Sequence, residues 1–176
     1  MMITYRYGLK PVLKKNTRIV VLGSMPSERS IEYQQYYGHP RNHFWYIMAE
    51  IFQEPFPSMN YQTKLARLTD RGVGLWDVIA SCDRRGSADQ RITNEQYNPL
   101  ENLLSYPEKL CALALNGTKA TDSLRKWENI HEVLPFERKQ LPSTSPVPGK
   151  NVKSFAEKTM LWREFFSHYI EVGRTL

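Results

Sequence analysis

The segment from residue 35 to residue 45, QYYGHPRNHFW, concentrates polar and aromatic side chains that could do chemistry. Asn42 carries an amide oxygen that can hold a water molecule, and Phe44 offers a flat face on which a planar ring can stack. With the free amides at the start of a helix, these groups suit the binding of a nucleobase. A local hydrogen bond for Asn42 and core packing for Phe44 are the alternatives, and we favour surface or capping roles for His39 and His43.

A second candidate segment follows the apolar run 19–22, which predicts a buried strand. It consists of Gly23, Ser24, Met25 and Pro26. The glycine and the X-Pro bond predict a tight turn that exposes backbone N–H and C=O groups. Neither GxxxxGK[ST] nor GxGxxG occurs, which removes the best evidence for phosphoryl transfer or dinucleotide binding. Taken alone, this segment is a plain strand-to-helix turn.

Two later segments end in side chains that could contact a nucleic acid. Asn116 closes the apolar run 110–115, and its amide can both donate to and accept from the edge of a base. An Asn-Gly turn or a helix cap is the simpler interpretation. The loop 141–149 is rich in hydroxyl groups and stiffened by three prolines, so it could grip phosphates or serve only as a turn.

The intervening segments predict the elements that must position these residues. Short apolar runs predict strands at 19–22, 73–79, 110–115 and 130–134. Apolar positions at three-and-four spacing predict helices at 44–52, 61–69, 118–127 and 152–170. Strands that alternate with helices pair in parallel through right-handed crossovers, so we expect one α/β domain over residues 1–176, a three-layer α/β/α sandwich. Ligands bind such folds at the carboxyl ends of the strands.

Composition is that of an ordinary folded domain of 176 residues, 41% hydrophobic and 24% charged. No apolar run reaches the ~20 residues that span a bilayer, and no signal peptide is recognisable, so we expect a cytoplasmic protein with no membrane partner. Cys82 and Cys111 and the four histidines lack metal-ligand spacing. We therefore expect two buried reduced thiols, no metal and no cofactor.

Positive charge is concentrated near the N-terminus. Of the net charge of +6, five charges lie in the first 27 residues, which contain no acid; they belong to Arg6, Lys10, Lys14, Lys15 and Arg18. Such a basic arm favours a polyanionic partner, and a solvated arm that serves only solubility is an equally good interpretation.

Taken in order, five segments resemble the hypoxanthine-DNA glycosylase branch of the uracil-DNA glycosylase superfamily. They are GSMP at 23–26, QYYGHPRNHFW at 35–45, LWDV at 75–78 with Ser81-Cys82 after it, LNG at 115–117 and LPSTSP at 141–146. The resemblance runs from about residue 18 to Trp162. It implies a four-stranded parallel sheet and a monomeric enzyme that needs no cofactor. The substrate would be single- or double-stranded DNA, from which a deaminated base is removed, hypoxanthine in first place and uracil as a second candidate.

The resemblance also implies a role for each candidate residue. Asn42 would be catalytic, Phe44 would stack on the base, and Asn116 would read the edge of the base. The base pocket would further be lined by Gly23, Ser24, Met25 and Pro26. The loop that grips DNA would comprise Ser143, Thr144, Ser145, Pro146, Val147 and Pro148, with the last two as the wedge that fills the vacated space.

Three positions depart from the pattern of the wider superfamily. Met25 stands where other branches place a water-activating Asp or Asn, Leu141 replaces a histidine that stabilises the leaving base, and Ser27 replaces a frequent glycine. Asn42 would then orient the water, and backbone amides would stabilise the base. The alternatives are a uracil-DNA glycosylase specific for mismatches, a non-catalytic DNA-binding relative and, with less support, a nucleoside hydrolase.

Overall fold

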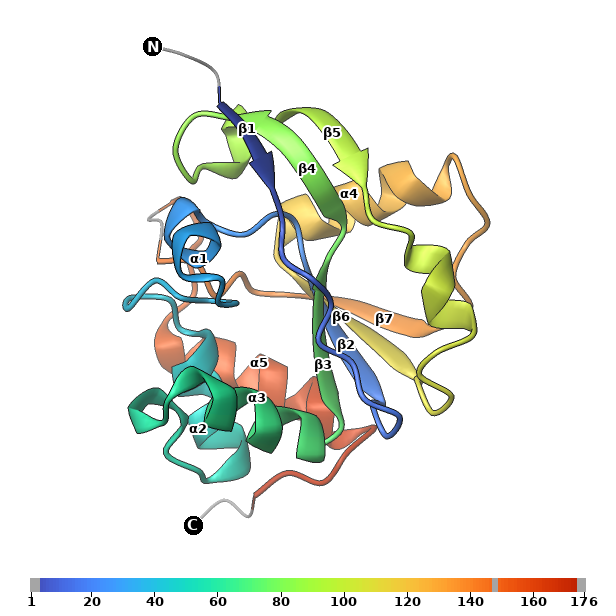
Figure 1. Cartoon of the computed structure of the whole chain (residues 1–176). Coiled ribbons are helices and arrows are strands. Elements are labelled where there is room, and N and C mark those ends of the chain that lie inside the picture. The colour runs from blue at the N-terminus through green and yellow to red at the C-terminus, as the bar shows by residue number, and fades with distance from the viewer. Residues whose placement is uncertain (1–3, 147–148, 174–176) are drawn as a thin grey trace.

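A four-stranded parallel sheet forms the centre of the computed structural model, which describes residues 4–146 and 149–173 (Figure 1). Its strands lie in the order β3-β2-β6-β7. They are β2 (Ile19–Gly23), β3 (Val73–Asp77), β6 (Ala112–Asn116) and β7 (Glu137–Leu141). All three pairings are parallel, as predicted from the alternation of strands and helices.

Helices cover both faces of this sheet, which confirms the three-layer α/β/α arrangement. On one face Ile19 and Val21 pack among residues of α2 (Phe44–Phe52), α3 (Tyr61–Asp70) and α5 (Phe155–Ser167). On the other face Val20 and Leu22 meet α4 (Thr118–Glu128) and the short 3₁₀ helix η3 (Leu100–Leu104). Because β2 is buried on both sides, it reads as a continuous apolar run.

The fourth strand differs from the prediction. Ile130 and Val133 are 71% and 69% exposed in the loop after α4, and the strand is β7, whose sequence is ERKQL. This strand lies at the edge of the sheet and most of its side chains face solvent, so it lacks the apolar run used to find strands. The predicted strand 73–79 is likewise two elements, because β3 ends at Asp77 and another strand begins at Ile79.

A second, antiparallel sheet was not expected from the sequence. It contains β1 (Thr4–Tyr7), β4 (Ile79–Arg84) and β5 (Thr93–Tyr97) in the order β1-β4-β5, at the top of Figure 1. The 3₁₀ helix η2 (Asp89–Arg91) connects β4 to β5. An ion pair between Arg6 and Glu28 joins this sheet to α1 (Glu28–Tyr33). The remaining short helix, η1 (Phe56–Ser58), follows α2.

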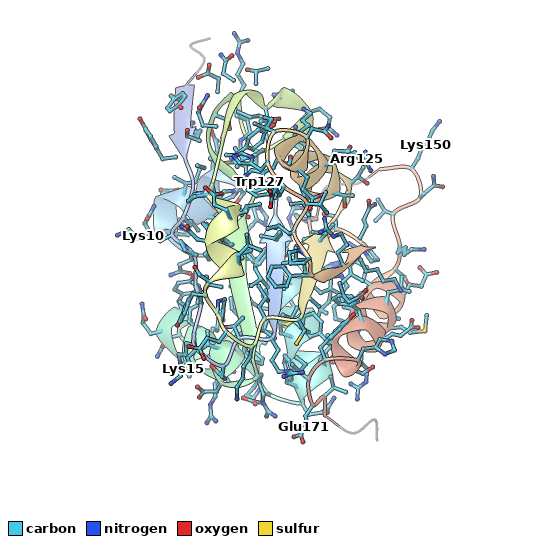
Figure 2. The ribbon with its side chains drawn as sticks, turned by 90° about the vertical axis from the view of Figure 1, so that its right-hand side faces the viewer. Lys10, Lys15, Arg125, Trp127, Lys150 and Glu171 are labelled. Carbon is cyan, nitrogen blue, oxygen red and sulfur yellow. The ribbon has the colours of Figure 1, made fainter. Side chains whose placement is uncertain are left out.

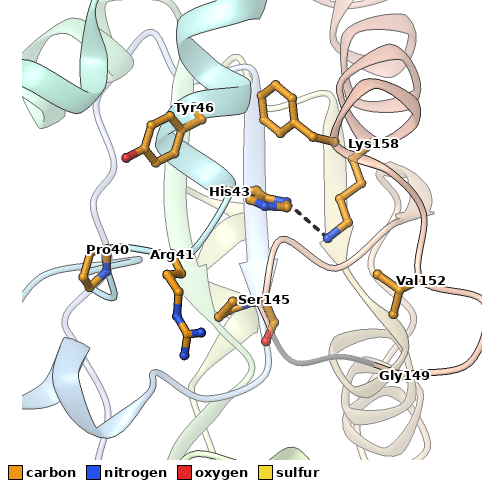
Figure 3. Close-up of a pocket in the computed structure, with 10 residues that line it drawn as sticks. Pro40, Arg41, His43, Tyr46, Ser145, Gly149, Val152 and Lys158 are labelled. Atoms are coloured by element: carbon orange, nitrogen blue, oxygen red, sulfur yellow. Dashed lines mark hydrogen bonds between the residues drawn. The ribbon is translucent and has the colours of Figure 1, made fainter.

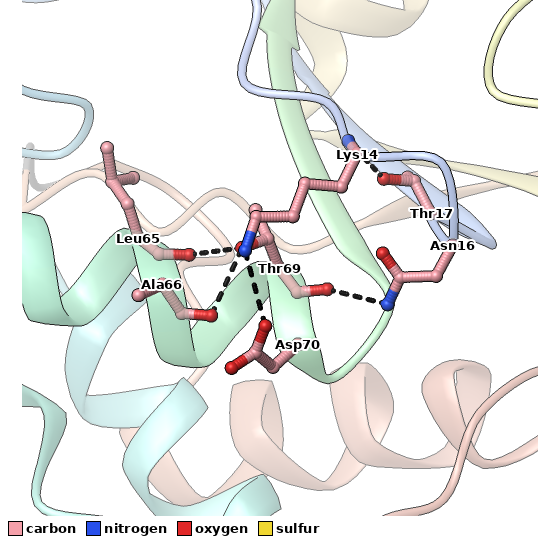
Figure 4. A network of polar contacts seen from close by, with 7 residues as sticks. All are labelled: Lys14, Asn16, Thr17, Leu65, Ala66, Thr69 and Asp70. Carbon is pink, nitrogen blue, oxygen red and sulfur yellow. Dashed lines mark hydrogen bonds and ion pairs between the residues drawn. The ribbon is translucent and has the colours of Figure 1, made fainter.

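The basic N-terminal segment is attached to the fold by hydrogen bonds and an ion pair, although Lys10, Lys14, Lys15 and Arg18 are all exposed. Figure 4 shows Lys14 paired with Asp70 at 3.2 Å, while Asn16 donates to the carbonyl of Thr69. Arg18 Nε donates to the carbonyl of Tyr169 at 2.8 Å. These contacts precede the first residue of β2, at the end of the sheet opposite Gly23. The exposed side chains of Lys10 and Lys15 complete the segment (Figure 2).

The C-terminal helix begins later than predicted. Ser154 and Glu157 form a capping box, in which the Ser154 side chain accepts from the Glu157 amide and the Glu157 carboxylate accepts from the Ser154 amide. The helix therefore starts at Phe155, and Val152 lies outside it, 54% exposed. Trp162, Phe165 and Phe166 are buried in the core as expected, whereas Phe155 is 37% exposed.

The thiols and the helix lengths complete the comparison with the sequence. Both cysteines are free; Cys82 is buried as predicted, whereas Cys111 is partly exposed, so the expectation of a buried thiol is wrong there. No helix within residues 4–146 and 149–173 is long and apolar enough to cross a membrane. In the same residues no group of three His, Cys, Asp or Glu side chains is arranged to hold a metal ion.

Candidate active site at the carboxyl edge of the sheet

The four parallel strands end side by side on residues from different motifs. In register across the sheet, Gly23 pairs with Asp77, Leu22 pairs with Leu115, and Asn116 pairs with Leu141. The carboxyl edge therefore presents, in order, Asp77, Gly23, Asn116 and Leu141. Three of these end residues were singled out from the sequence, and the edge is where an α/β sandwich binds its ligands.

Thr144 joins this edge to the start of α2. The amide of Asn116 accepts from Thr144 N through Oδ1 and donates to Thr144 Oγ1 through Nδ2, both at 3.0 Å. His43 N donates to the carbonyl oxygen of Thr144 at 2.9 Å. Thr144 is only 1% exposed, so this residue of the predicted DNA-gripping loop faces the protein interior.

The neighbours of Thr144 in the loop are more accessible. Ser143 is exposed, and Ser145 and Pro146 are partly exposed. The loop is supported from below, because Trp162 Nε1 donates to the carbonyl of Pro142 at 3.0 Å. The proposed wedge residues, Val147 and Pro148, lie outside the described residues.

Asn42 lies just before α2 and is partly exposed. Its Oδ1 accepts a hydrogen bond from Phe44 N at 2.9 Å, which is the local bond considered as the alternative for this residue. An amide oxygen has two lone pairs, so this bond leaves one for a water molecule. His39 and His43 are local residues of the same turn: Arg41 N donates to His39 Nδ1 at 3.1 Å, and His43 is the N-cap residue of α2 without a side-chain capping bond.

Phe44 has no exposed surface. Trp45 and Trp162 meet its ring edge-on, with centroid distances of 5.0 and 6.1 Å. Tyr37 lies flat against it, with centroids 4.0 Å apart and ring planes 23° from parallel. Asn116 Nδ2 also donates to Tyr37 Oη at 3.3 Å, and burial raises the pKa of this phenol. Tyr37 belongs to the segment 35–45, but no role was predicted for it.

The first motif is buried, so the expectation of exposed carbonyl groups is wrong for its main chain. The carbonyls of Gly23 and Ser24 accept from Val78 N and Ile79 N at 2.9 and 3.0 Å, and the carbonyl of Pro26 accepts from the guanidinium of Arg84. The side chains are occupied as well. Ser24 Oγ donates to Asp89 Oδ1 at 3.0 Å, and Met25 packs in an apolar cluster with Ile79, Cys82 and Ile92.

Asp77 ends β3 at this edge and, like Tyr37, is a residue for which no role was predicted. It is 4% exposed, and burial, reinforced by the charge of Asp89, raises its pKa to about 7 although Arg84 opposes the shift. Its Oδ1 fills the space that a Cβ at Gly23 would need, so only glycine fits there, and its Oδ2 has no hydrogen-bond partner among the described residues. An acid inside the apolar run 73–79 was the available signal for this residue.

A cleft of about 710 Å³ opens beside Asn42 (Figure 3). Its lining combines cationic, hydroxyl and aromatic groups, among them Arg41, His43, Tyr46, Ser145, Phe155 and Lys158. Lys158 is 3% exposed and its Nζ lies 3.4 Å from His43 Nδ1. Burial lowers the pKa of both side chains, and the charge of Lys158 lowers that of His43 further.

A second cleft, of about 770 Å³, borders the same loop. Its lining includes Asn116, Ser143, Ser145, Lys119 and Lys153. Ser145 and Lys158 line both clefts, so the two concave surfaces adjoin at this loop, and both carry lysine or arginine side chains. Such surfaces fit the two sides of a bound phosphate backbone. The lysines were not predicted, because a lone lysine carries no distinguishing pattern.

Comparisons with known proteins find relatives that match most of the chain. The model of the uracil DNA glycosylase superfamily matches residues 11–166. A hypoxanthine DNA glycosylase of Methanosarcina acetivorans is 37% identical over 161 residues, which cover 92% of this chain and 98% of the relative. A hypoxanthine DNA glycosylase of Methanosarcina barkeri is 36% identical with the same coverage. The solution NMR structure of an M. acetivorans protein described as a uracil DNA glycosylase superposes with a TM-score of 0.79 at 34% identity, covering 94% of this chain and 98% of that one.

Proposed function

The chain belongs to the uracil DNA glycosylase superfamily, and from this membership we propose that it is a DNA glycosylase that removes hypoxanthine from DNA. The two relatives named hypoxanthine DNA glycosylase support this substrate, because they match the chain almost from end to end. The observation that carries the proposal is the bonding of Thr144 to both Asn116 and the start of α2. Through it, an amide that can read a base lies beside the helix start that carries Asn42 and Phe44.

The substrate must leave the duplex before any of these groups can reach it. Flipping a nucleotide costs a few kcal/mol, and the cost is least where pairing is already weak, as it is for a deaminated base. The loop that borders the two clefts has exposed hydroxyl groups, and Arg41 and Lys153 line these clefts. These groups can hold the phosphates that flank the extruded nucleotide.

The chemical step is hydrolysis of the N-glycosidic bond. As this bond breaks, positive charge develops on the sugar and negative charge on the departing base. The side-chain amide of Asn42 cannot deprotonate water at neutral pH, so its part is to orient a water molecule through Oδ1. The flanking phosphates offset the charge of the sugar, and hydrogen-bond donors of the pocket offset that of the base.

The leaving base has no histidine to protonate or stabilise it at the end of β7. Leu141 occupies that position and is 1% exposed. Donation to the departing base therefore falls to backbone amides and to the amide of Asn116. Electrostatic stabilisation by these donors and by the flanking phosphates, and not proton transfer by a side chain, is then the main source of acceleration.

A panel of labelled oligonucleotides tests the proposal. Each oligonucleotide, single-stranded or in a duplex, carries hypoxanthine, uracil, xanthine or a normal base, and alkali after incubation cleaves any abasic site. We expect cleavage at hypoxanthine first and none at normal bases, with the Asn42→Ala protein as the matched control. Preferential cleavage at uracil opposite guanine would favour the mismatch-specific alternative, and cleavage of no substrate would favour a non-catalytic DNA-binding role.

A further inference from the structure

Tyr37 occupies the space that a flipped base would need. The ring of Phe44 has no exposed surface, and the ring stacked on it at 4.0 Å is that of Tyr37. Trp45 and Trp162 contact Phe44 only edge-on. A base that stacks on Phe44 must therefore take the place of Tyr37.

The hydroxyl group of Tyr37 occupies the position of a base oxygen as well. Asn116 uses Oδ1 and one N–H on Thr144, and its other N–H is donated to Tyr37 Oη at 3.3 Å. The phenol oxygen accepts this bond as the O6 atom of hypoxanthine would. The phenol ring of Tyr37 thus makes both contacts that were expected of the base, the stack on Phe44 and the hydrogen bond from Asn116.

The backbone aims Tyr37 into the pocket and is itself held in place. Tyr37 has a φ of +55°, in the left-handed region that residues other than glycine rarely adopt. On either side, Tyr36 N donates to Tyr61 Oη and Gly38 N donates to Ser30 Oγ, both at 3.0 Å. Because the Tyr37 side chain is partly exposed, rotation about its own bonds can release the ring while the backbone stays fixed.

We propose that Tyr37 is a displaceable plug that keeps the base pocket closed until a flipped base takes over its stack on Phe44 and its hydrogen bond from Asn116. This inference rests on the proposed function. It also supplies a basis for selectivity, because only a base that restores both contacts compensates for the loss of the plug. Hypoxanthine presents an acceptor oxygen to Asn116, whereas adenine presents an amino group, which donates and leaves the Asn116 N–H without an acceptor.

Binding of free hypoxanthine, measured by calorimetry, tests the plug directly. The variant Tyr37→Gly removes the ring and keeps the left-handed backbone without strain. If the closed form holds about nine-tenths of the wild-type molecules, opening the pocket tightens the apparent binding of the free base about 10-fold. Tyr37→Phe keeps the stack and loses the hydrogen bond, so we expect an effect of the same sign and smaller size.

Single-turnover excision from a hypoxanthine duplex completes the test. We expect Tyr37→Gly to discriminate less against adenine than the wild type does. Unchanged or weaker binding of hypoxanthine by Tyr37→Gly, or by Tyr37→Phe should the glycine variant not fold, overturns the plug, because a fixed wall of the pocket would give that result. A wild-type protein that cleaves no substrate refutes the proposed function, and the binding comparison still decides the role of Tyr37.

Discussion

The amide of Asn116 holds Thr144 by both of its ends, with Oδ1 on the backbone N–H and Nδ2 on the side-chain hydroxyl. The residue expected to read the base therefore also fixes the loop that is expected to grip DNA. Loss of activity on replacing Asn116 would by itself not distinguish these roles. A second variant must weaken the clamp while leaving the amide of Asn116 in place.

Asn116→Ala and Thr144→Val form such a pair. Asn116→Ala leaves the buried N–H of Thr144 unpaired, and we expect it to lower the free energy of unfolding by about 1–3 kcal/mol. Thr144→Val removes only the hydroxyl contact, at a cost of about 1 kcal/mol. We expect Asn116→Ala to slow excision of hypoxanthine far more than Thr144→Val does, with little change in binding of undamaged DNA. Losses of excision that merely follow the losses of stability in the two variants would make Asn116 a structural clamp.

Asn42 should combine a small structural role with a large catalytic one. Asn42→Ala removes the acceptor of the Phe44 N–H, which costs about 1 kcal/mol of stability. We expect it to slow single-turnover excision by roughly 10²-fold or more and to leave DNA binding nearly intact. Asn42→Asp keeps an oxygen acceptor at the start of a helix, so it should retain more activity than the alanine variant. Cleavage by Asn42→Ala at the wild-type rate would remove Asn42 from the mechanism.

Salt dependence should identify the cations that contact phosphates. Arg41 and Lys153 line the two clefts beside the loop, whereas Lys15 lies beyond the opposite end of β2. We expect Arg41→Ala and Lys153→Ala each to reduce the slope of log K against log salt by about 1 and Lys15→Ala to leave it unchanged. Titrations at several salt concentrations measure these slopes. An equal reduction by Lys15→Ala would mean that the N-terminal segment also contacts DNA phosphates.

Asp77 should make stability depend on pH. Burial raises its pKa from 3.8 to about 7, so between these values the folded protein keeps a proton that the unfolded chain releases. Stability is therefore lost as the pH rises through this window, by about 4 kcal/mol at most. We expect Asp77→Asn to melt at a higher temperature than the wild type at pH 8 and at the same temperature near pH 3.5. Exposed Glu101 supplies the control, since Glu101→Gln should give no such gain.

Buried elements could be predicted from the sequence because their surroundings impose a pattern. The run 19–22 and the apolar stripe 44–52 coincide with β2 and α2, which are covered by other elements. The small antiparallel sheet could not be found this way. Its β5 strand, TNEQY, is mostly exposed, and β4 continues the apolar run of β3 after a single residue.

From the strand pattern alone, only the site residues at the ends of strands could be placed next to one another. Gly23 and Asn116 could be placed on one edge because parallel strands carry their carboxyl ends together. The clamp on Thr144 depends on the path of a loop 28 residues further along the chain, and no spacing rule relates the two positions. Tyr37 reaches the pocket through a left-handed backbone at a residue other than glycine, which leaves no mark in the sequence.

The charged side chains of β7 hinder aggregation of the protein through this edge strand. A strand at the edge of a sheet has unpaired N–H and C=O groups to which another chain can add a strand. In β7 the side chains of Glu137, Lys139 and Gln140 are exposed, and these charged and polar groups give an incoming apolar strand nothing to pack against. The polar side chains that hid this strand from a hydropathy pattern thus hinder the addition of a strand from another molecule at this edge, and replacing Lys139 with valine would favour aggregation.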